Sequence, residues 1–473
     1  MLLEAAVTFI ICYMRNILRV LPILLSLTLA IIGLVVYSGY SELEKGDNAS
    51  SYLEAAQHHQ SAAQRILWRA DLYELAGHEY YYAKEYSLAE ASYQKAFQRH
   101  ALSADGWVAW GDVHYLVGEA ERATEIWDQG LAQTNPSEKL YSRLALIYQE
   151  KKEYAKAAEY LQRYVSNHLQ DASAHYRLGL LLTLTDTQTA LSELITASQL
   201  DPQLDPAVQT LRATLNLASL SDTPSAKFVI TGRGLGLVSE WELAQAAFEQ
   251  AVKVDEQNAE AWAWLGEAYQ QTGGTDAFTS LEHALSLNPK SAVVHTLRGL
   301  YFQRVGNNRE ALTEFQAAAT LQPDDPTLYI SIGESFSKLG DMIRALEAYQ
   351  YATTLAPDEI SYWRLLAQFC AQNNIHVKDV GIPAAQKAVV IKADDSSLQD
   401  LLGWLLLLDA RYPEAERTLL HALELDSQNA SAHFHIGMLY LQLNNQVSAR
   451  EHLVSARDLG NPDAQAVLNQ YFP

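Results

Sequence analysis

The segment Trp262-Ala-Trp-Leu265-Gly266-Glu-Ala-Tyr269 decides the fold of this chain. On a helix, Trp262, Leu265 and Tyr269 share one face, and Gly266 leaves room on that face for a second helix. Working outward, small and aromatic residues recur where such a second helix should pack, at positions that differ by 34: Ala311, Phe315, Ala318 and Pro323, then Ala345, Tyr349, Ala352 and Pro357. A repeat of this length predicts stacked helix pairs.

The same pattern recurs along most of the chain. Repeat starts are predicted at Ala70, Ala104, Glu138, Ala172, Ser225, Ala259, Ala292, Pro326, Ile360, Ser396 and Ala430. The position of Gly266 is occupied only by glycine or alanine: Gly77, Gly111, Ala145, Gly179, Gly232, Gly299, Gly333, Ala367, Gly403 and Gly437. A larger side chain there would hold the two helices of a unit apart, so each unit is expected to pack closely and to stack on its neighbours.

These motifs resemble the tetratricopeptide repeat (TPR) family, over about four-fifths of the chain. The resemblance implies an all-α, right-handed solenoid of about eleven antiparallel helix pairs. It also implies that the first helix of each pair lines a concave groove, and that positions 2, 5, 9 and 12 of each unit face a ligand.

The repeat phase breaks between Ala172 and Ser225. The excess, residues 205–224, has a helical apolar stripe and is predicted to be a joining helix, either a hinge or a degenerate repeat. It divides a four-repeat block, residues 70–204, from a seven-repeat block, residues 225–463. Residues 42–69 are predicted to form a flexible stalk to Ser50 and then a capping helix, and residues 464–473 a C-terminal capping helix.

Residues 20–41 contain no charged side chain and are long enough to span a membrane, with Tyr37 and Tyr40 at the interface. Arg15 and Arg19 lie before this run and acidic residues follow it, so residues 1–19 are predicted to be cytoplasmic and the repeats exocytoplasmic. The alternative is a cleaved signal peptide and a secreted protein, although the apolar run is longer than usual for one.

Composition narrows the function. A formal net charge of −22 disfavours nucleic-acid binding. The two cysteines, Cys12 and Cys370, form neither a disulfide framework nor a cysteine-rich metal site. The sequence carries no phosphate-binding loop, zinc-protease helix, nucleophile elbow or EF-hand, so we expect no cofactor, no metal and no enzyme.

The groove positions predict two chemically different ends. At the N-terminal end they are acidic and aromatic: Asp71, Glu74, His78, Tyr81, Asp105, Asp112 and Tyr115. At the C-terminal end they are mostly apolar, with Trp404, Phe434 and Met438. The first end is expected to receive a basic or polar segment and the second apolar anchors. The alternative is that these residues are solvated or cover neighbouring helices. The Lys, Asn and Arg clamp by which some family members hold a chain terminus is absent.

The main functional hypothesis is a single-pass membrane scaffold that binds a protein or peptide partner in its groove. One alternative is a structural element of the cell envelope without a dissociable partner. The other is an enzyme with an acid–base or metal site near Glu74, His78 and Asp112.

Overall fold

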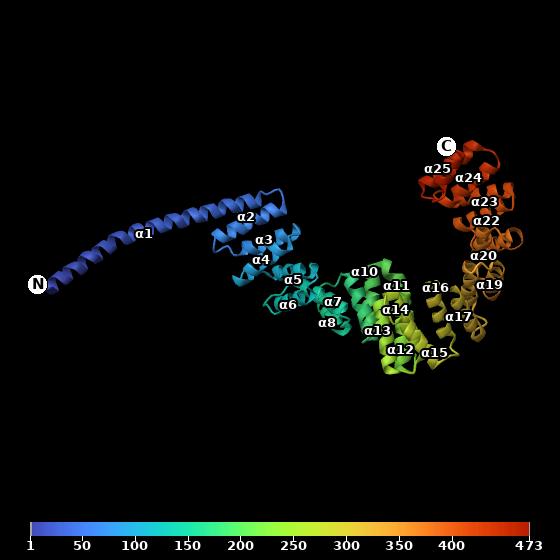
Figure 1. Cartoon of the computed structure of the whole chain (residues 1–473), viewed down its shortest axis with the longest axis horizontal. Coiled ribbons are helices and arrows are strands. Elements are labelled where there is room, and N and C mark those ends of the chain that lie inside the picture. Colours follow the sequence, from blue (N-terminus) through green and yellow to red (C-terminus); the bar gives the residue numbers. More distant parts are fainter. Residues whose placement is uncertain (1, 473) are drawn as a thin grey trace. The chain divides into compact units, whose positions relative to one another are not determined.

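The computed structural model describes the backbone of residues 2–472 and the side chains of residues 21–472. Side chains of the predicted cytoplasmic segment, residues 1–19, therefore lie outside the described residues. Over residues 2–472 the regular structure consists of 26 α-helices and two single helical turns, without a strand (Figure 1). The all-α prediction is confirmed.

The chain divides into two compact units, Met1–Asn216 and Leu217–Pro473, and the boundary falls within α11 (Asp205–Ser219). The other helices of the first unit are α1 Leu2–Asp47, α2 Tyr52–Arg65, α3 Asp71–Tyr82, α4 Tyr86–Gln98, α5 Ala104–Leu116, α6 Ala120–Leu131, α7 Lys139–Glu150, α8 Tyr154–Val165, α9 Ala172–Leu182, α10 Thr187–Leu200 and the 3-10 turn η1 Pro202–Leu204.

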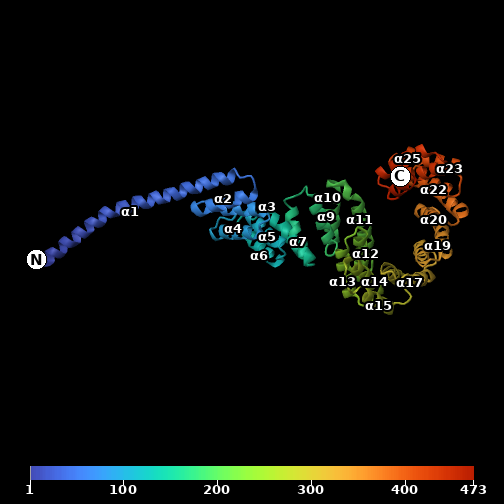
Figure 2. The same ribbon diagram turned by 45° about the horizontal axis from the view of Figure 1, so that its top comes forward.

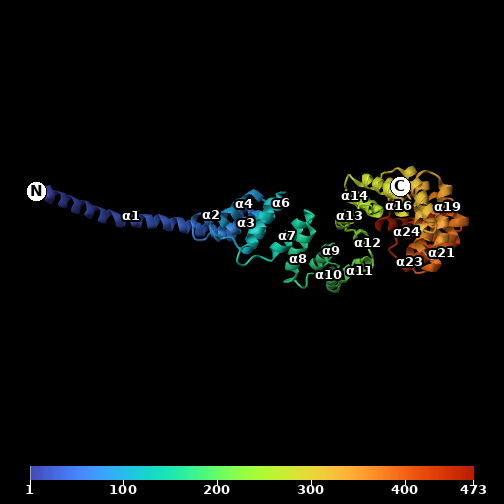
Figure 3. The ribbon, with the colours of Figure 1, turned by 90° about the horizontal axis from the view of Figure 1, so that it is seen from below.

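The second unit is helical in the same way, and its helices follow a curved path (Figure 3). They are α12 Pro224–Leu237, α13 Trp241–Val254, α14 Ala259–Thr272, α15 Ala277–Leu287, α16 Ala292–Arg304, α17 Asn308–Leu321, α18 Pro326–Lys338, α19 Met342–Leu355, α20 Ile360–Asn373, the π turn η2 Val377–Gly381, α21 Ile382–Ile391, α22 Ser396–Leu408, α23 Tyr412–Leu425, α24 Ala430–Gln442, α25 Gln446–Asp458 and α26 Ala464–Tyr471.

The repeat units are eleven helix pairs, from α3 with α4 to α24 with α25, and α11 stands unpaired between the fourth pair, α9 with α10, and the fifth, α12 with α13. The first helix of every pair begins within one residue of its predicted repeat start. In most units, the side chain of an Asp, Asn, Ser, Thr or Glu just before that helix accepts a hydrogen bond from a backbone N–H of its first turn. In these units the capping fixes where the first helix starts.

The small residue of each first helix faces a large side chain of the second. A Cβ atom at Gly111 would lie 2.0 Å from Trp127 Nε1, and one at Gly299 would lie 2.6 Å from the Phe315 ring. Where glycine opposes leucine, as at Gly437, the distance to Leu453 would be 2.7 Å. The glycine therefore admits a side chain that an alanine would displace.

The residue at the Trp262 position also makes a hydrogen bond, which explains why tryptophan, histidine or glutamine can occupy this position in different repeats. Each of these side chains places a ring or amide nitrogen on the carbonyl oxygen of the residue six earlier, in the preceding loop. The pairs are His175–Leu169 (3.3 Å), Trp262–Glu256 (2.9 Å), His295–Pro289 (3.0 Å), Trp363–Pro357 (2.8 Å), Gln399–Ala393 (3.1 Å) and His433–Ser427 (3.2 Å). In these six repeats, an N–H donor at this position ties the preceding loop to the helix.

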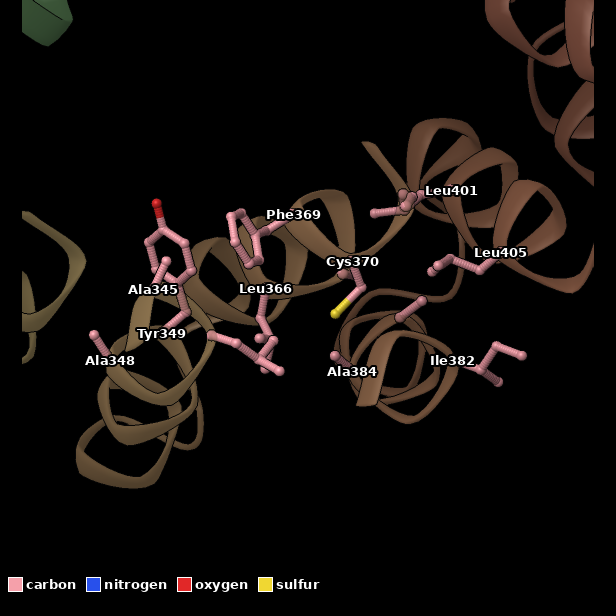
Figure 4. Close-up of a cluster of buried hydrophobic side chains, with 14 of the residues drawn as sticks. Ala345, Ala348, Tyr349, Leu366, Phe369, Cys370, Ile382, Ala384, Leu401 and Leu405 are labelled. Carbon is pink, nitrogen blue, oxygen red and sulfur yellow. The ribbon is translucent and has the colours of Figure 1, made fainter. Parts of the chain in front are cut away.

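The core of the second unit is continuous across neighbouring repeats, and Figure 4 shows part of it around Cys370. Burial raises the pKa of the Cys370 thiol to about 11, so this cysteine packs as a protonated apolar side chain. The π turn η2 lies between α20 and α21, and a Cβ atom at its Gly381 would lie 2.8 Å from Leu405 and 2.9 Å from Cys370.

The structure differs from the flexible stalk expected at residues 42–50, because α1 continues as a helix to Asp47 and packs along α2 (Figure 2). Glu42 Oε2 lies 2.7 Å from His58 Nδ1. The His59 ring lies against Gly46 and reaches Asp47 Oδ1 at 3.3 Å and Glu79 at 2.8 Å. A packed helix pair therefore joins α1 to the first repeat.

The part of α1 from Leu21 to Asp47 is long and apolar enough to cross a membrane, and the side chains of residues 21–35 are exposed. A signal sequence near an N-terminus has the same properties. In α11, the buried stripe is Val208, Leu211, Leu215 and Ala218, whereas Leu217 and, just beyond the helix, Leu220 are exposed.

Candidate functional site

The candidate residues of α3 are engaged within the first two repeats. Asp71 pairs with Arg69, whose Nη2 lies 2.8 Å from Oδ2. Glu74 accepts hydrogen bonds from the Ser103 backbone N–H at 2.5 Å and from the Ser103 hydroxyl, and it lies 3.4 Å from His78 Nε2. Burial is the largest single influence on the pKa of Glu74 and raises it. The hydrogen bonds to His78 and Ser103 together outweigh burial, so the pKa is lowered. The Glu74 carboxylate thus fastens the start of the second repeat to the first.

The candidate residues of α5 make the same kind of contact with the third repeat. Asp105 accepts from Ser137 at 3.1 Å and Lys139 at 3.3 Å. Asp112 is held by two guanidinium nitrogens of Arg143, at 2.7 and 3.0 Å. These cations offset much of the expected acidic patch, so its carboxylates join adjacent repeats.

Two tyrosines complete this end of the predicted groove. The Tyr115 hydroxyl donates to Glu150 Oε1 at 2.5 Å. Tyr81 packs edge-on against Tyr82, with ring centroids 5.5 Å apart, and burial raises its pKa. Both tyrosines are partly buried. An aromatic surface therefore lies beside the compensated carboxylates.

The acid–base alternative named Glu74, His78 and Asp112. Glu74 and His78 contact each other, and His78 Nδ1 lies 2.9 Å from the Tyr93 hydroxyl, whereas Asp112 is bound by Arg143. Among the described side chains, no group of three or more His, Cys, Asp or Glu residues is placed to hold a metal ion. The structure does not assemble the three residues into one site.

At the C-terminal end, Trp404, Phe434 and Met438 are all partly buried. Sequence reasoning treated this end as apolar, but it contains a buried polar pair, His435 Nδ1 and Asp400 Oδ1, 2.7 Å apart. Trp404 stacks on the His435 ring at 4.9 Å. The aromatic anchors are therefore oriented by a histidine that the predicted groove positions did not include.

A pocket of about 410 Å³ lies on α7, α8 and α9, and no candidate residue was placed there. Its walls include Ser142, Leu146 and Gln149, which occupy positions 5, 9 and 12 of the third repeat. Arg143 and Arg177, one repeat length apart, line it as well, and Arg177 Nε donates to Gln149 at 2.6 Å. The recurrence of arginine one repeat length apart is the feature of the sequence that could have indicated this pocket.

In class, this molecule is a helical-repeat protein: close glycine contacts hold the two helices of a unit together, and polar contacts join neighbouring repeats. The family model described as tetratricopeptide repeat matches residues 142–203, 296–360 and 401–464, and another described as TPR repeat matches residues 239–273. The chain therefore carries TPR repeats in these segments, as its motifs indicated.

Known relatives match only in part. The chain is 24% identical over 246 residues to superkiller complex protein 3 of Mus musculus, covering 50% of this chain and 15% of that protein. It is 28% identical over 124 residues to anaphase-promoting complex subunit 3 of Schizosaccharomyces pombe, covering 26% and 18%. The chain thus spans less than a fifth of their length. A crystal structure of the APC/C hetero-tetramer Cut9-Hcn1 aligns over 93% of this chain and 96% of that one, with 14% identity and a TM-score of 0.42.

Proposed function

We propose that this protein is a membrane-anchored TPR scaffold that binds a segment of a protein partner on the first helices of its repeats. The observation that carries the proposal is the pocket on α7, α8 and α9, because its lining residues Ser142, Leu146 and Gln149 fall on the positions that the family resemblance assigns to ligand contact. Pocket and repeat register are independent observations.

The chemistry of the pocket favours a segment with an apolar side chain next to an acidic group. Leu146, Leu161 and Leu181 supply apolar wall, and Arg143 and Arg177 supply guanidinium groups. A guanidinium has five N–H donors, and two nitrogens of Arg143 serve Asp112. An incoming carboxylate can join this network. The aromatic cluster of Trp404, Phe434 and Met438 offers a second contact region for apolar anchors.

The groove is tested with a photo-crosslinking amino acid at Leu146, in the full-length protein in its native membrane. Leu88 on α4 is the matched control, because both leucines are 40% exposed but only Leu146 lines the pocket. We expect a discrete crosslinked partner from position 146 and none from position 88. The crosslink should weaken when Arg177 is replaced by alanine. Equal crosslinking from both positions would contradict groove binding, and no partner from either would favour a purely structural role.

The anchor is tested by alkaline carbonate extraction of membranes. We expect the full-length chain to stay in the pellet, and Ile31→Arg with Ile32→Arg to release it, since each arginine at mid-span costs about 3 kcal/mol. A shorter, soluble chain that lacks the apolar run would instead establish a cleaved signal peptide. For orientation, protease added to intact cells should reach the repeats; digestion only in inside-out vesicles would reverse the proposed topology.

A further inference from the structure

We propose that the end of the first repeat nearest the apolar part of α1 rests on the membrane surface, with Leu67 and Trp68 in the headgroup layer and basic side chains facing anionic phospholipid. This inference rests on the proposed membrane anchoring, and it adds a second membrane contact made by the repeat domain itself.

The register of α1 and α2 places the loop after α2 at the end of the apolar run. The two helices run antiparallel: a Cβ atom at Gly46 would lie 2.4 Å from the His59 ring, and one at Gly39 would lie 2.5 Å from Ile66. In agreement, Val36 and Ser38 are partly buried, whereas residues 21–35 are exposed. Ile66 is therefore level with the last turns of the apolar segment.

The loop at that level presents apolar side chains to the outside. Leu67 is 63% exposed and Trp68 is 62% exposed. On α1, Tyr37 and Tyr40 are exposed as well. Tryptophan and tyrosine favour the membrane–water interface, where the ring lies among headgroups and the polar atom reaches water. In a loop surrounded by water, the exposed side chains of Leu67 and Trp68 would have nothing to pack against. At the membrane interface they pack among the lipid headgroups.

Basic residues surround the same loop. Arg65 and Arg69 flank it. Lys95 of α4 and Arg99, which directly follows α4, lie over the Tyr73 ring, 5.7 and 5.6 Å from its centroid. Tyr73 is in the first turn of α3, directly after the loop. Glu42 and Asp71 pair with Arg65 and Arg69, which leaves Lys95 and Arg99 as the local positive charge in a chain of net charge −22. Such a cluster is complementary to anionic lipid.

The short length of α1 beyond the loop limits how far the first repeat can lie from the membrane. Its helix extends only from Gly39 to Asp47 beyond the loop contact, which is about 12 Å at 1.5 Å per residue. Because α1 and α2 are packed together, the first repeat cannot move away from the bilayer as it would on a flexible stalk.

The test reconstitutes full-length protein into phosphatidylcholine vesicles containing phosphatidylglycerol, with and without dibrominated acyl chains that quench nearby tryptophan. We expect bromolipid to quench the wild type and expect Trp68→Phe to lose that quenching. The matched control is Trp68→Phe with Leu169→Trp, which puts a tryptophan at a loop position of equal exposure, 63%, between α8 and α9. Quenching should not return in this variant. Lys95→Gln with Arg99→Gln should weaken quenching of Trp68, and replacement of phosphatidylglycerol by phosphatidylcholine should do the same.

The outcomes separate the two proposals. If the chain floats with the vesicles but Trp68→Phe leaves quenching unchanged, the loop is away from the membrane and this inference is overturned while anchoring stands. If the chain does not float, anchoring itself has failed. Equal quenching at positions 68 and 169 would indicate nonspecific lipid contact and would also overturn the inference.

Discussion

Replacing Gly111 by alanine is expected to destabilise the first unit by about 3 kcal/mol, the upper range for overpacking a close helix contact. The added Cβ would lie 2.0 Å from Nε1 of Trp127, a fully buried side chain. Trp127 cannot turn away freely, because its Nε1–H donates to the Val108 carbonyl oxygen at 3.1 Å. The helices α5 and α6 must therefore separate or this hydrogen bond must break. Urea unfolding of the full-length protein, followed by circular dichroism, measures the loss.

Two further variants test whether the loss of stability comes from the contact between Gly111 and Trp127. Ala145→Gly, at the same position of the next repeat, should cost only about 1 kcal/mol, through helix propensity alone. Gly111→Ala combined with Trp127→Leu reproduces the pair that the third repeat has at these positions, Ala145 and Leu161, and should recover part of the stability. An unchanged urea midpoint for Gly111→Ala would show that α5 and α6 are not in close contact at this point.

Replacing His59 by alanine is expected to loosen α1 from the first repeat and to cost about 3 kcal/mol, since it removes a buried group bound to two carboxylates. The His59 side chain is 3% exposed and connects three helices, reaching Asp47 of α1 and Glu79 of α3 from α2. Hydrogen exchange at the C-terminal turns of α1 and in α2 should accelerate. His58→Ala is the matched control: His58 bonds only Glu42, is 28% exposed, and should have a much smaller effect. Equal effects of the two variants would exclude His59 as the connecting residue.

The same contact should depend on pH. The hydrogen bond to Glu79 raises the pKa of His59 above its ordinary value of 6.5. Protonated His59 therefore stabilises the folded state fully below that ordinary value, and the stabilisation is lost as pH rises through the folded-state pKa. The chain contains an internal contrast, because burial and then the neighbouring His433 lower the pKa of His452. Stability at the last repeat should fall as pH drops below 6.5 and passes the lowered value. As the pH is raised from below the lowered pKa of His452 to above the raised pKa of His59, hydrogen-exchange protection, corrected for the intrinsic exchange rate, should first rise at α25 and then fall at α2. A change in the same direction at both helices would contradict the assignment.

Much of the fold follows from the sequence, because each repeat contacts mainly itself and its neighbours. A glycine that recurs with a period of 34 at one helix face requires a second helix at that face, so the helix pairs and their starts could be predicted without the structure. The groove positions were implied by the resemblance to the TPR family, and the pocket at Leu146 includes three of them. The loop carbonyl oxygen that accepts a hydrogen bond from tryptophan, histidine or glutamine at the Trp262 position was visible only in the structure.

Only the tertiary structure decided which groove side chains have partners. Glu74, Asp105 and Asp112 read as a free acidic patch, yet their partners Ser103, Lys139 and Arg143 lie about thirty residues further on. The repeat period determines which helix faces meet, because backbone spacing is local and regular. Pairing of long charged side chains depends on rotamers and on neighbours that one repeat does not contain. The attachment of α1 to α2 belongs to the same category: the sequence determined an apolar segment and a repeat domain, and the fit of Gly46 against His59 decided that they meet as packed helices.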